Sequence, residues 1–383
     1  MEICVINPFF FPYAGGTEKV LMQVYKRLSK KHNITVISYA LGAGQKEAEE
    51  LVEGIKVVRL KTKYMDVPGL PLPFMVAEGF RERIQRESAD IYHINNRYLV
   101  FPLALGAIKN KGKKLALTLH NALPKNIGPV TDFCGLVYDA AWGRKIMKAA
   151  DLITGITQNV VDTTVPAAYR NKTHVVYNGV DFKSFRPRSR SDRNVKIARE
   201  RLGDGITIMN NARLVPQKGQ KYLMRAFAEL VKEGIASNLL IIGKGPLESS
   251  LRGIAGRLHI PDRLSIISGI PEGQLPYYYN AGDIFALPSL YEPASIALLE
   301  ALSSGVPTVA AKTGGIPEMM KDNGLYVNPK SEKDIKEKIS MLLGDKEMAE
   351  KFAKNGRALM MKEHNWDDIA KEYERLFLET IRY

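Results

Sequence analysis

Short apolar runs alternate with longer amphipathic stretches along almost the whole chain, and this alternation restricts the fold more than any other feature. An apolar run of four to eight residues closed by turn residues is typical of a buried strand, and the stretches between the runs have helical periodicity. Strands that alternate with helices form parallel sheets with helices on both faces. The sequence therefore predicts an α/β protein with doubly wound parallel sheets.

The alternation occurs in two series, separated by a basic, Pro-containing stretch, FKSFRPRSRSDRNVKIARERLG (182–203). A chain of 383 residues exceeds what one hydrophobic core usually organises, and such a stretch favours an interdomain connection. We therefore expect one Rossmann-like domain over residues 1–185 and a second over 186–364. The strands expected in the first are EICVINP, ITVISYA, IKVVRL, DIYHIN, LALTLHN, DLITGIT and THVVYNG, and in the second ITIMNNARL, NLLIIGKG, LSIISGI, DIFALPS and VPTVAA.

The net charge of +14 is unevenly distributed, since residues 1–185 hold 25 Lys and Arg against 16 Asp and Glu. A basic surplus of this kind favours an acidic partner such as a nucleotide phosphate, an anionic lipid head group or nucleic acid. No helix-turn-helix, zinc-finger or RNP-type aromatic pattern supports nucleic acid, so we expect none as a partner.

The cysteines and the N-terminus favour a cytoplasmic protein. Cys4 and Cys134 lie far apart with no metal-ligand spacing, and we interpret both as reduced. The sequence passes from Met1 directly into a strand pattern, without a basic leader, and no 18-residue apolar run follows. Secretion and membrane spanning are therefore not expected.

The loop ARLVPQKG (212–219) follows an expected strand of the second domain and holds two cations, Arg213 and Lys218. Ligands of doubly wound sheets bind beyond the carboxyl ends of the strands. Arg213 can offer a bidentate fork and Lys218 a point charge to one diphosphate, which would stabilise a departing nucleoside diphosphate without a metal. The alternative is two solvated surface cations.

The stretch YEPASIALLE (291–300) places Glu292 and Glu300 within an apolar run. Pro293 suits the first helical position, so we expect a helix to begin there, with Glu292 at its mouth and Glu300 about two turns inside. Glu300 would then need hydrogen-bond donors, such as ligand hydroxyls, beside the helix. The alternative is that Glu292 is an N-cap and Glu300 a solvated helix position.

A helix that begins at Pro293 would also offer an anion site. The first backbone N–H groups of a helix have no intrahelical acceptor and lie at the positive end of the helix dipole. The groups expected to face a phosphate are the N–H groups of Ala294, Ser295 and Ile296.

Two pairs of glycines stand in strand-to-helix loops. Gly243 and Gly245 in IIGKGPL lack the third glycine of a dinucleotide fingerprint, and either a tight turn or close approach of backbone to a ligand would explain them. Gly15 and Gly16 precede the first expected helix (about 17–31), which Thr17 could cap with Glu18 in its first turn. These two glycines allow a phosphate or sugar to approach, or serve only a turn.

His120 ends the expected strand LALTLH of the first domain. This position suits either a hydrogen bond to a sugar or proton transfer, and a structural role is the alternative. The chain has no Asp-x-Asp pair, Gly-x-Ser-x-Gly elbow, His-Glu-x-x-His or Walker lysine motif, so metal-dependent and acyl-transfer chemistry are not favoured.

In order along the chain, these motifs resemble those of the retaining glycosyltransferases of family 4. They are GGTE (15–18), YNGVD (177–181), ARLVPQKG (212–219), IIGKGPL (241–247), DIFALPSLYEPASIALLEALSSGVPTVA (283–310) and GGIPE (314–318). The resemblance implies a GT-B fold, in which two Rossmann-like domains face each other across a cleft, with a final helix (365–383) that packs back on the N-terminal domain. Many members have Phe-Gly where this chain has Ala294 and Ser295, a change that keeps the backbone donors but alters the local shape.

The resemblance also implies roles for individual residues. Glu292 would contact the donor sugar near the reacting centre, and Glu300 would hold the ribose hydroxyls. Arg213 and Lys218 match the diphosphate-binding pair, and His120 matches the active-site histidine. Gly16 matches the N-terminal donor loop. The donor-binding residues that we expect also comprise Gly15, Gly243, Ile270, Ala294, Ser295 and Ile296.

We therefore expect a retaining transferase that moves a sugar from a nucleoside diphosphate sugar, with uridine the expected base, to an acceptor hydroxyl without cofactor or metal. A nucleotide-sugar epimerase on the same fold, which would need no acceptor, and a non-catalytic sugar-nucleotide-binding protein are the alternatives. The acceptor is a glycan, lipid or small molecule. YMDVPGLPLPFMVAEGF (64–80) and the basic FRERIQR that overlaps its end fit contact with an anionic membrane, or a buried loop with a solvated helix face.

Overall fold

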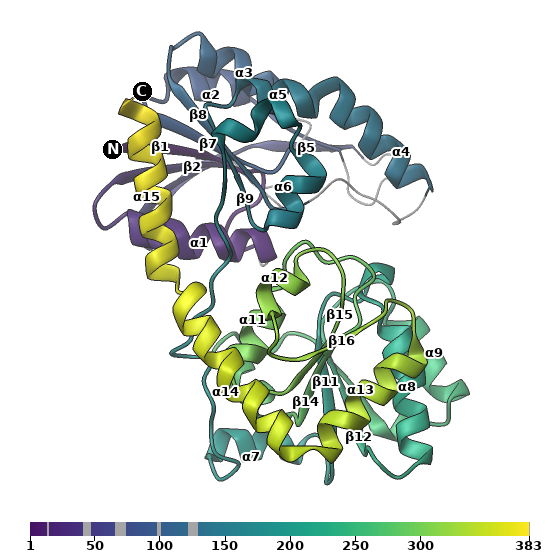
Figure 1. The fold of residues 1–383 in the computed structure, drawn as a ribbon. Coiled ribbons are helices and arrows are strands. Elements are labelled where there is room, and N and C mark those ends of the chain that lie inside the picture. Colours follow the sequence, from purple (N-terminus) through teal and green to yellow (C-terminus); the bar gives the residue numbers. More distant parts are fainter. Residues whose placement is uncertain (14, 41–46, 66–73, 98–100, 122–128, 383) are drawn as a thin grey trace. The chain divides into compact units, whose positions relative to one another are not determined.

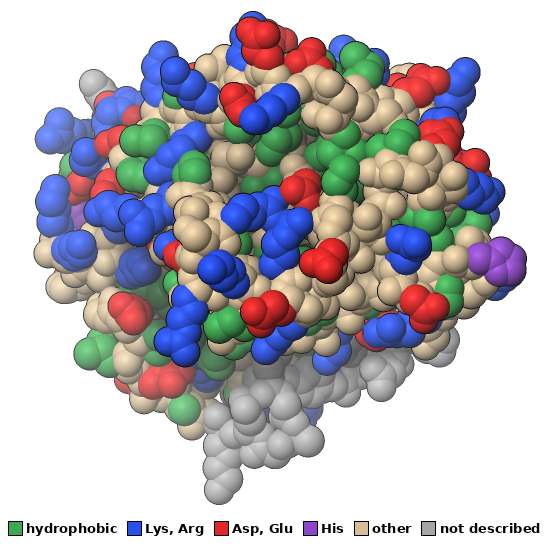
Figure 2. All heavy atoms as spheres, turned by 90° about the horizontal axis from the view of Figure 1, so that it is seen from below, with side chains coloured by type: hydrophobic (Ala, Val, Ile, Leu, Met, Phe, Trp, Pro, Cys, Tyr) green, Lys and Arg blue, Asp and Glu red, His purple; other side chains and the backbone are tan. Residues whose placement is uncertain are grey.

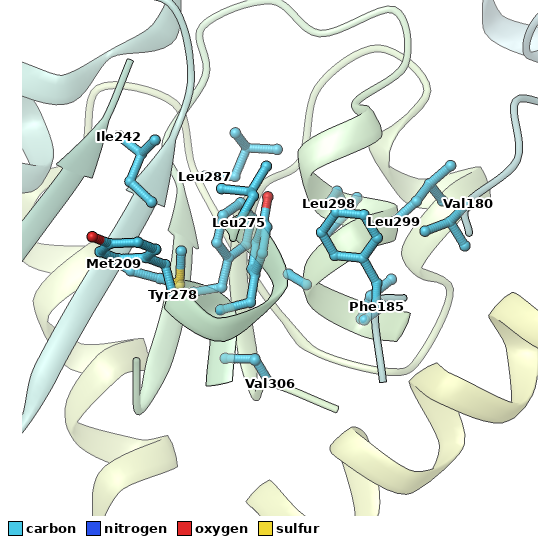
Figure 3. Packing of buried hydrophobic residues seen from close by; sticks show 14 of the residues in the cluster. Val180, Phe185, Met209, Ile242, Leu275, Tyr278, Leu287, Leu298, Leu299 and Val306 are labelled. Atoms are coloured by element: carbon cyan, nitrogen blue, oxygen red, sulfur yellow. The ribbon is translucent and has the colours of Figure 1, made fainter. Parts of the chain in front are cut away.

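The computed structural model describes residues 1–13, 15–40, 47–65, 74–97, 101–121 and 129–382. The chain divides into two compact units, one comprising Met1–Asn178 with Trp366–Tyr383 and the other Gly179–Asn365. The division lies a few residues before position 185, because Val180 and Phe185 are buried in the core of the second unit (Figure 3).

Among the described residues, the first unit has an eight-stranded sheet of order β10-β9-β8-β7-β1-β2-β4-β3. All the strands expected from the sequence are present, and neighbours are parallel except for the edge pair β3 and β4. The antiparallel β3 was not expected; its exposed Glu49 and Glu50 make the edge charged, which discourages pairing with another chain. The strands are β1 (Glu2–Ile6), β2 (Asn33–Tyr39), β3 (Ala48–Val52), β4 (Ile55–Leu60), β7 (Ile91–Asn95), β8 (Lys114–Leu119), β9 (Leu152–Gly155) and β10 (Thr173–Val175).

The helices of the first unit connect these strands, as the parallel order requires. A separate hairpin, β5 (Thr62–Met65) and β6 (Phe74–Ala77), precedes α2. The helical segments are α1 (Gly16–Leu28), α2 (Phe80–Arg86), α3 (Phe101–Lys109), α4 (Pro129–Tyr138), η1 (Asp139–Gly143), α5 (Arg144–Ala149), α6 (Gln158–Thr164) and η2 (Ala167–Lys172).

The last helix, α15 (Trp366–Arg382), packs beside α1 in the first unit (Figure 1). Its buried face includes Ile369, Tyr373, Leu376 and Phe377, at the periodic positions of the sequence. Arg27 Nε donates to Asp367 Oδ1 at 2.5 Å on this contact. The buried apolar stripe of α15 therefore completes the first unit from the far end of the chain.

The second unit holds, in its described residues, a fully parallel six-stranded sheet of order β13-β12-β11-β14-β15-β16. The strands are β11 (Thr207–Asn211), β12 (Asn238–Ile242), β13 (Leu264–Ile267), β14 (Ile284–Leu287), β15 (Thr308–Ala311) and β16 (Leu325–Val327). The helical segments are α7 (Arg193–Glu200), η3 (Pro216–Lys218), α8 (Gln220–Lys232), α9 (Glu248–Arg257), η4 (Pro261–Arg263), α10 (Leu275–Ala281), α11 (Ile296–Ser303), α12 (Ile316–Met320), α13 (Glu332–Gly344) and α14 (Lys346–Glu363).

The basic stretch expected to be an interdomain connection belongs largely to the second unit. It contains α7, which packs on α10. Arg190 Nη2 donates to Asp283 Oδ1 at 2.6 Å, and the backbone N–H of Arg188 donates to Asn280 Oδ1 at 2.7 Å. These polar contacts to the second unit were not visible as local sequence patterns.

The core on one side of the second sheet is built by α10, α11 and the strands they cover. Figure 3 shows Leu298 and Leu299 of α11 and Leu275 of α10 among its buried side chains. This packing sets the position of α11, the helix that carries Glu300.

The surface is strongly charged. On the face shown in Figure 2, Lys and Arg side chains are interspersed with Asp and Glu side chains. In the described ranges, no helix combines the length and the apolar character needed to cross a bilayer. Residues 66–73, about half of the apolar segment 64–80, lie outside the described residues. In α2, which follows it, Arg83 pairs with Glu49 at 2.6 Å and with Glu87 at 3.0 Å, so not every basic side chain of FRERIQR is free to meet a membrane.

Candidate active site

The loops after β11, β14 and β15 meet at the carboxyl edge of the second sheet, where these strands are neighbours. The backbone N–H of Leu290 donates to Gln217 O at 2.8 Å, and Gln217 Nε2 donates to Tyr291 O at 3.1 Å. The N–H of Gly315 donates to Glu292 O at 3.0 Å. The motifs ARLVPQKG, LPSLYEP and GGIPE are therefore joined into one structure by backbone hydrogen bonds.

Lys218 and Glu292 form the charged centre of these loops. Lys218 Nζ lies 2.5 Å from Glu292 Oε2, and Ser289 Oγ donates to the same oxygen at 3.0 Å. The Glu292 side chain is 4% exposed and that of Lys218 is 14% exposed. A carboxylate this buried requires a charge partner and hydrogen bonds, and Lys218 and Ser289 supply them. The sequence did not predict this pairing, although it placed both residues at the donor.

Arg213, the other expected diphosphate cation, lies in the same loop as Lys218 and is exposed. Its backbone carbonyl accepts hydrogen bonds from Gln220 Nε2 at 2.9 Å and from the N–H of Val215 at 3.0 Å. Among the described residues its guanidinium forms no ion pair. The loop backbone is therefore held in place while the charged group faces solvent.

Gly243 and Gly245 explain how the loop after β12 lies against the loop that carries Arg213. A Cβ on Gly243 would lie 2.0 Å from Ala212 O, and one on Gly245 would lie 2.4 Å from Leu214 O. The N–H of Leu214 donates to Lys244 O at 3.1 Å. The missing side chains thus admit the backbone of a neighbouring loop, an explanation that neither alternative from the sequence included.

The helix expected to begin at Pro293 begins instead at Ile296, with Ser295 as its N-cap. Ser295 Oγ accepts from the N–H of Leu298 at 3.2 Å, which is the arrangement that makes serine a favoured cap. Glu300 is therefore just over one turn inside α11, rather than two. The alternative in which Glu292 is the N-cap is also wrong.

The change of helix start also revises the expected anion site. The N–H of Ser295 is directed at Met319 Sδ, 3.4 Å away, so it does not belong to a free row of donors. Ala294 and Ile296 are half-buried. The first helical N–H groups are accordingly those of Ile296 and the residues after it, and the phosphate contact expected of the Ser295 N–H stays a prediction.

Glu300 is buried, at 4% exposure, so a solvated position is excluded. Tyr279 of α10 donates its hydroxyl to Glu300 Oε2 at 2.8 Å, and Asn211 Nδ2 donates to the Tyr279 hydroxyl at 2.9 Å. Burial and the charge of Glu300 raise the pKa of Tyr279 well above 10, which keeps it a hydrogen-bond donor. Sequence reasoning missed Tyr279, Asn211 and Ser289. Of these three, only Asn211 had a feature that could have indicated a site residue, namely its position at the end of a strand.

Ile270, the remaining donor-binding residue expected in the second unit, follows β13. It is partly buried and packs against the core cluster that includes Leu275 and Tyr278. It therefore lies beyond the carboxyl end of a strand, as do Lys218 and Glu292.

In the first unit, Gly15 and Gly16 lie between β1 and α1. Gly15 is the N-cap and α1 begins at Gly16, so Thr17 does not cap this helix. A Cβ on Gly15 would lie 2.0 Å from Glu18 Oε2. Around a Cβ on Gly16, no described atom lies within 4 Å, apart from its chain neighbours and the backbone of its own helix. Gly15 thus accommodates the first turn, and the backbone at Gly16 stays open to approach.

His120 follows β8 and is buried. Its backbone N–H donates to Asn96 Oδ1 at 2.9 Å, and its Nε2 lies 3.0 Å from Asn95 Oδ1. Nε2 of His120 and the side-chain amide of Asn95 are therefore hydrogen-bond partners. Burial lowers the pKa of His120 to about 3, so the ring is neutral at pH 7.

A second buried histidine, His93 of β7, lies near His120. Its Nε2 lies 2.7 Å from Thr118 Oγ1, and the Tyr25 hydroxyl contacts its Nδ1. Burial, with a smaller effect of His120, lowers the pKa of His93 to about 3. Two neutral imidazoles therefore lie within one polar network in the interior of the first unit.

These two histidines predict a loss of stability in mild acid. Their pKa values of about 3 in the folded chain lie below the unfolded value of about 6.5, so between these pH values the unfolded chain binds more protons. The contribution of the two neutral histidines to the free energy of unfolding is fully present above pH 6.5. It falls as the pH falls, by about 1.4 kcal/mol per pH unit for each histidine. Urea unfolding of the wild type from pH 7 to pH 5 should show this slope.

His120→Asn should remove about half of the histidine contribution to this slope, whereas His174→Gln, at an exposed position, should leave the slope unchanged. An unaltered slope in His120→Asn would show that His120 is not held neutral by the fold.

No group of three or more His, Cys, Asp or Glu residues is gathered as a metal site within the ranges that the structure describes.

Comparisons with known proteins agree with this arrangement. The family model described as Glycosyl transferases group 1 matches residues 192–359, and the one described as Glycosyltransferase Family 4 matches residues 14–184. The chain is 31% identical over 383 residues to a GDP-mannose-dependent alpha-(1-6)-phosphatidylinositol monomannoside mannosyltransferase of Mycobacterium tuberculosis, covering 96% of each chain. It is 23% identical to an N-acetyl-alpha-D-glucosaminyl L-malate synthase of Bacillus anthracis, covering 97% of this chain and 96% of that protein.

Solved structures share the fold. HepE from Anabaena, in complex with UDP, matches with a TM-score of 0.79 and 21% identity, over 99% of this chain and 100% of that one. A sucrose-phosphate synthase from Thermosynechococcus elongatus matches with a TM-score of 0.77 and 18% identity, over 100% and 99% of the two chains. The chain has the GT-B fold and belongs to the family 4 glycosyltransferases, which transfer sugars.

Proposed function

We propose that the protein is a retaining glycosyltransferase that moves a hexosyl group from a nucleoside diphosphate sugar to an acceptor hydroxyl, without a metal ion. The observation that carries the proposal is the buried pair of Lys218 and Glu292, 2.5 Å apart, in loops at the carboxyl edge of the second sheet. This edge is where doubly wound sheets bind nucleotides. A buried cation and carboxylate there supply both a phosphate partner and a sugar partner.

In this proposal, cations stabilise the leaving diphosphate. The flexible Lys218 ammonium contacts a phosphate while it stays near Glu292, and the exposed Arg213 offers its fork to the other phosphate. The first N–H groups of α11 add the positive end of a helix dipole. Charge that develops on the leaving group is then met by groups already in place, which is usually the largest contribution to catalysis of this kind.

The two glutamates and the histidine have different tasks. Glu292 accepts hydrogen bonds from the donor sugar, and Glu300 accepts them from the ribose hydroxyls. A carboxylate has about four acceptor positions, so Glu300 can bind ribose while it keeps the Tyr279 hydrogen bond. His120, neutral at pH 7, acts as a hydrogen-bond partner of the substrate rather than as a general acid. No carboxylate is assigned as a covalent nucleophile, and attack occurs on the face that the diphosphate leaves.

The proposal also covers the base of the donor nucleotide and the chemical class of the acceptor. Uridine is the expected base, although the name of the mycobacterial relative specifies GDP-mannose. Relatives whose names specify phosphatidylinositol lipids include that enzyme and, at 25% identity, a component of the human phosphatidylinositol N-acetylglucosaminyltransferase. We propose a lipid or glycan acceptor on this basis, which would bring the protein to the surface of an anionic membrane.

A donor panel tests this function. Uridine, guanosine and adenosine diphosphate sugars would be added without acceptor, in the presence of EDTA, while thermal shift and diphosphate release are measured. We expect one base to raise the melting temperature, with slow hydrolysis of its sugar. Proton NMR of the sugar at early times reports whether the anomeric configuration is retained. Absence of a response to every base would favour a protein that does not use these donors.

A variant sharpens the assignment of Glu300. Glu300→Gln should weaken binding of the preferred nucleoside diphosphate about tenfold, but should leave binding of inorganic diphosphate, which has no ribose, nearly unchanged. Equal weakening of both ligands would contradict a ribose contact at Glu300.

A further inference from the structure

A pocket of about 810 Å³ lies in the first unit, at the edge of the sheet opposite His120. Strands β8 and β9 begin at it, with Lys114 and Leu152, and Lys172 immediately precedes β10. His120 follows the other end of β8, about 20 Å away at roughly 3.3 Å per strand residue. The pocket is therefore separate from the residues proposed for catalysis.

The lining of this pocket is strongly basic. It draws on α3, β8, α5, the end of η2 and the face of α15 near its C-terminus. Its lysines are Lys109, Lys114, Lys145, Lys148 and Lys172, accompanied by His174.

The two acidic residues of the lining already have partners. Asp151 Oδ2 accepts from Lys109 Nζ at 3.1 Å and from the N–H of Leu115 at 2.8 Å. Glu379 Oε1 accepts from Arg375 at 2.7 Å. In the part of the chain that the structure describes, Lys114, Lys145 and Lys148 form no ion pair. Three lysines of the lining therefore have no acidic partner among the described residues.

The Lys172 ammonium has a defined position in the lining of this pocket. Its Nζ donates to Ala150 O at 2.5 Å and to Lys148 O at 3.2 Å, so its ammonium is held by backbone carbonyls. Burial lowers the pKa of Lys172, and the charge of Lys109 lowers it further, whereas Asp151 raises it. An anion in the pocket would be attracted by these ammonium groups.

The size and chemistry of the pocket indicate its ligand. Volumes of 300–1,000 Å³ are typical of small-molecule sites. Among the described residues, the lining includes no Phe, Tyr or Trp on which a nucleobase could stack. Lysine ammonium groups bind phosphates as point charges. We infer that this pocket binds a small anion that carries two or more phosphate groups, with Lys114, Lys145 and Lys148 as its main contacts. Such an anion is either a free polyphosphate or the phosphorylated head group of a lipid.

Calorimetric titration with sodium triphosphate at 150 mM salt tests the site. The variant Lys145→Ser/Lys148→Ser removes two of the unpaired lysines, and Lys351→Ser/Lys354→Ser makes the same charge change at exposed positions of α14. We expect the pocket variant to lose a binding site, or to bind at least tenfold more weakly there, while the α14 variant binds like the wild type. Equal weakening in both variants, or no binding to the wild type, would overturn the inference.

Vesicles separate the two sources of phosphate. Phosphatidylcholine vesicles with phosphatidylinositol bisphosphate would be compared with vesicles of the same surface charge made with phosphatidylserine. Binding to the first kind only, lost in Lys145→Ser/Lys148→Ser, supports the site and identifies a lipid head group. Binding of triphosphate without such vesicle binding supports the site and identifies a free anion. Equal binding to both vesicles, with no triphosphate site, overturns the inference in favour of general attraction to negative charge.

Discussion

Lys218→Ala is expected to reduce turnover about a thousandfold, because it removes a positive charge from the place where the leaving diphosphate develops negative charge. The structure adds a second effect. The substitution leaves Glu292 buried without the ammonium that lies 2.5 Å from its Oε2, and breaking a buried pair in this way costs about 3 kcal/mol. The free energy of unfolding, from urea titration, and the steady-state turnover of the best donor measure the two effects.

The double variant Lys218→Ala/Glu292→Ala separates catalysis from stability. Removal of both charges leaves no unpaired carboxylate, so much of the lost stability should return, whereas turnover should stay low. Arg225→Ala is the control, because Arg225 pairs with Glu332 at 2.7 Å on the surface, where such pairs contribute about 0.5 kcal/mol. Because Glu292 is also assigned to the donor sugar, recovery of turnover together with stability in the double variant would contradict the roles proposed for both residues.

Gly314→Ala is expected to destabilise the second unit by more than about 3 kcal/mol and to reduce turnover with it. Gly314 has a φ of +53°, and a Cβ at this position would lie 2.1 Å from Glu292 O. The atom in the way is the backbone carbonyl oxygen of Glu292, which accepts a hydrogen bond from the N–H of Gly315 at 3.0 Å. A backbone atom held in this way cannot rotate away as a side chain could. The alanine would therefore displace Glu292 itself.

Gly234→Ala is the matched control for this clash. Gly234 has a φ of +71°, also in the left-handed region. Apart from its chain neighbours, no described atom lies within 4 Å of a Cβ at this position. It should cost only about 1 kcal/mol, the backbone penalty of an L residue in this region. If Gly314→Ala costs no more than Gly234→Ala in urea titration, the GGIPE loop does not support Glu292.

The strands of both units were predictable because their signal is local. Runs such as ICVI and LLII are buried on both faces, as parallel strands are, and the turn residues that bound them are adjacent in sequence. The face of α15 could be predicted for the same reason, since its period is contained within one helix. The edge strand β3 was missed because its exposed charged residues have no such pattern.

The start of α11 shows where local reasoning fails. Both Pro293 and Ser295 are good residues for a helix N-terminus, and the sequence alone favoured the proline. In the structure, the carbonyl of Glu292 is bonded to Gly315, and the serine caps the helix. The residue at which α11 begins is therefore linked to a hydrogen bond from a loop more than twenty residues further along the chain.

The sequence by itself determined the α/β class, the order of the strands along the chain, and the positions of the polar loops that follow them, because periodicity and turn chemistry act between near neighbours. Only the tertiary structure decided that Lys218 faces Glu292, that Tyr279 donates to Glu300, and that lysines from α3, β8, α5 and η2 line one pocket. These contacts join residues far apart in the chain. They depend on the sheet order and on the packing of each helix, which no local pattern contains.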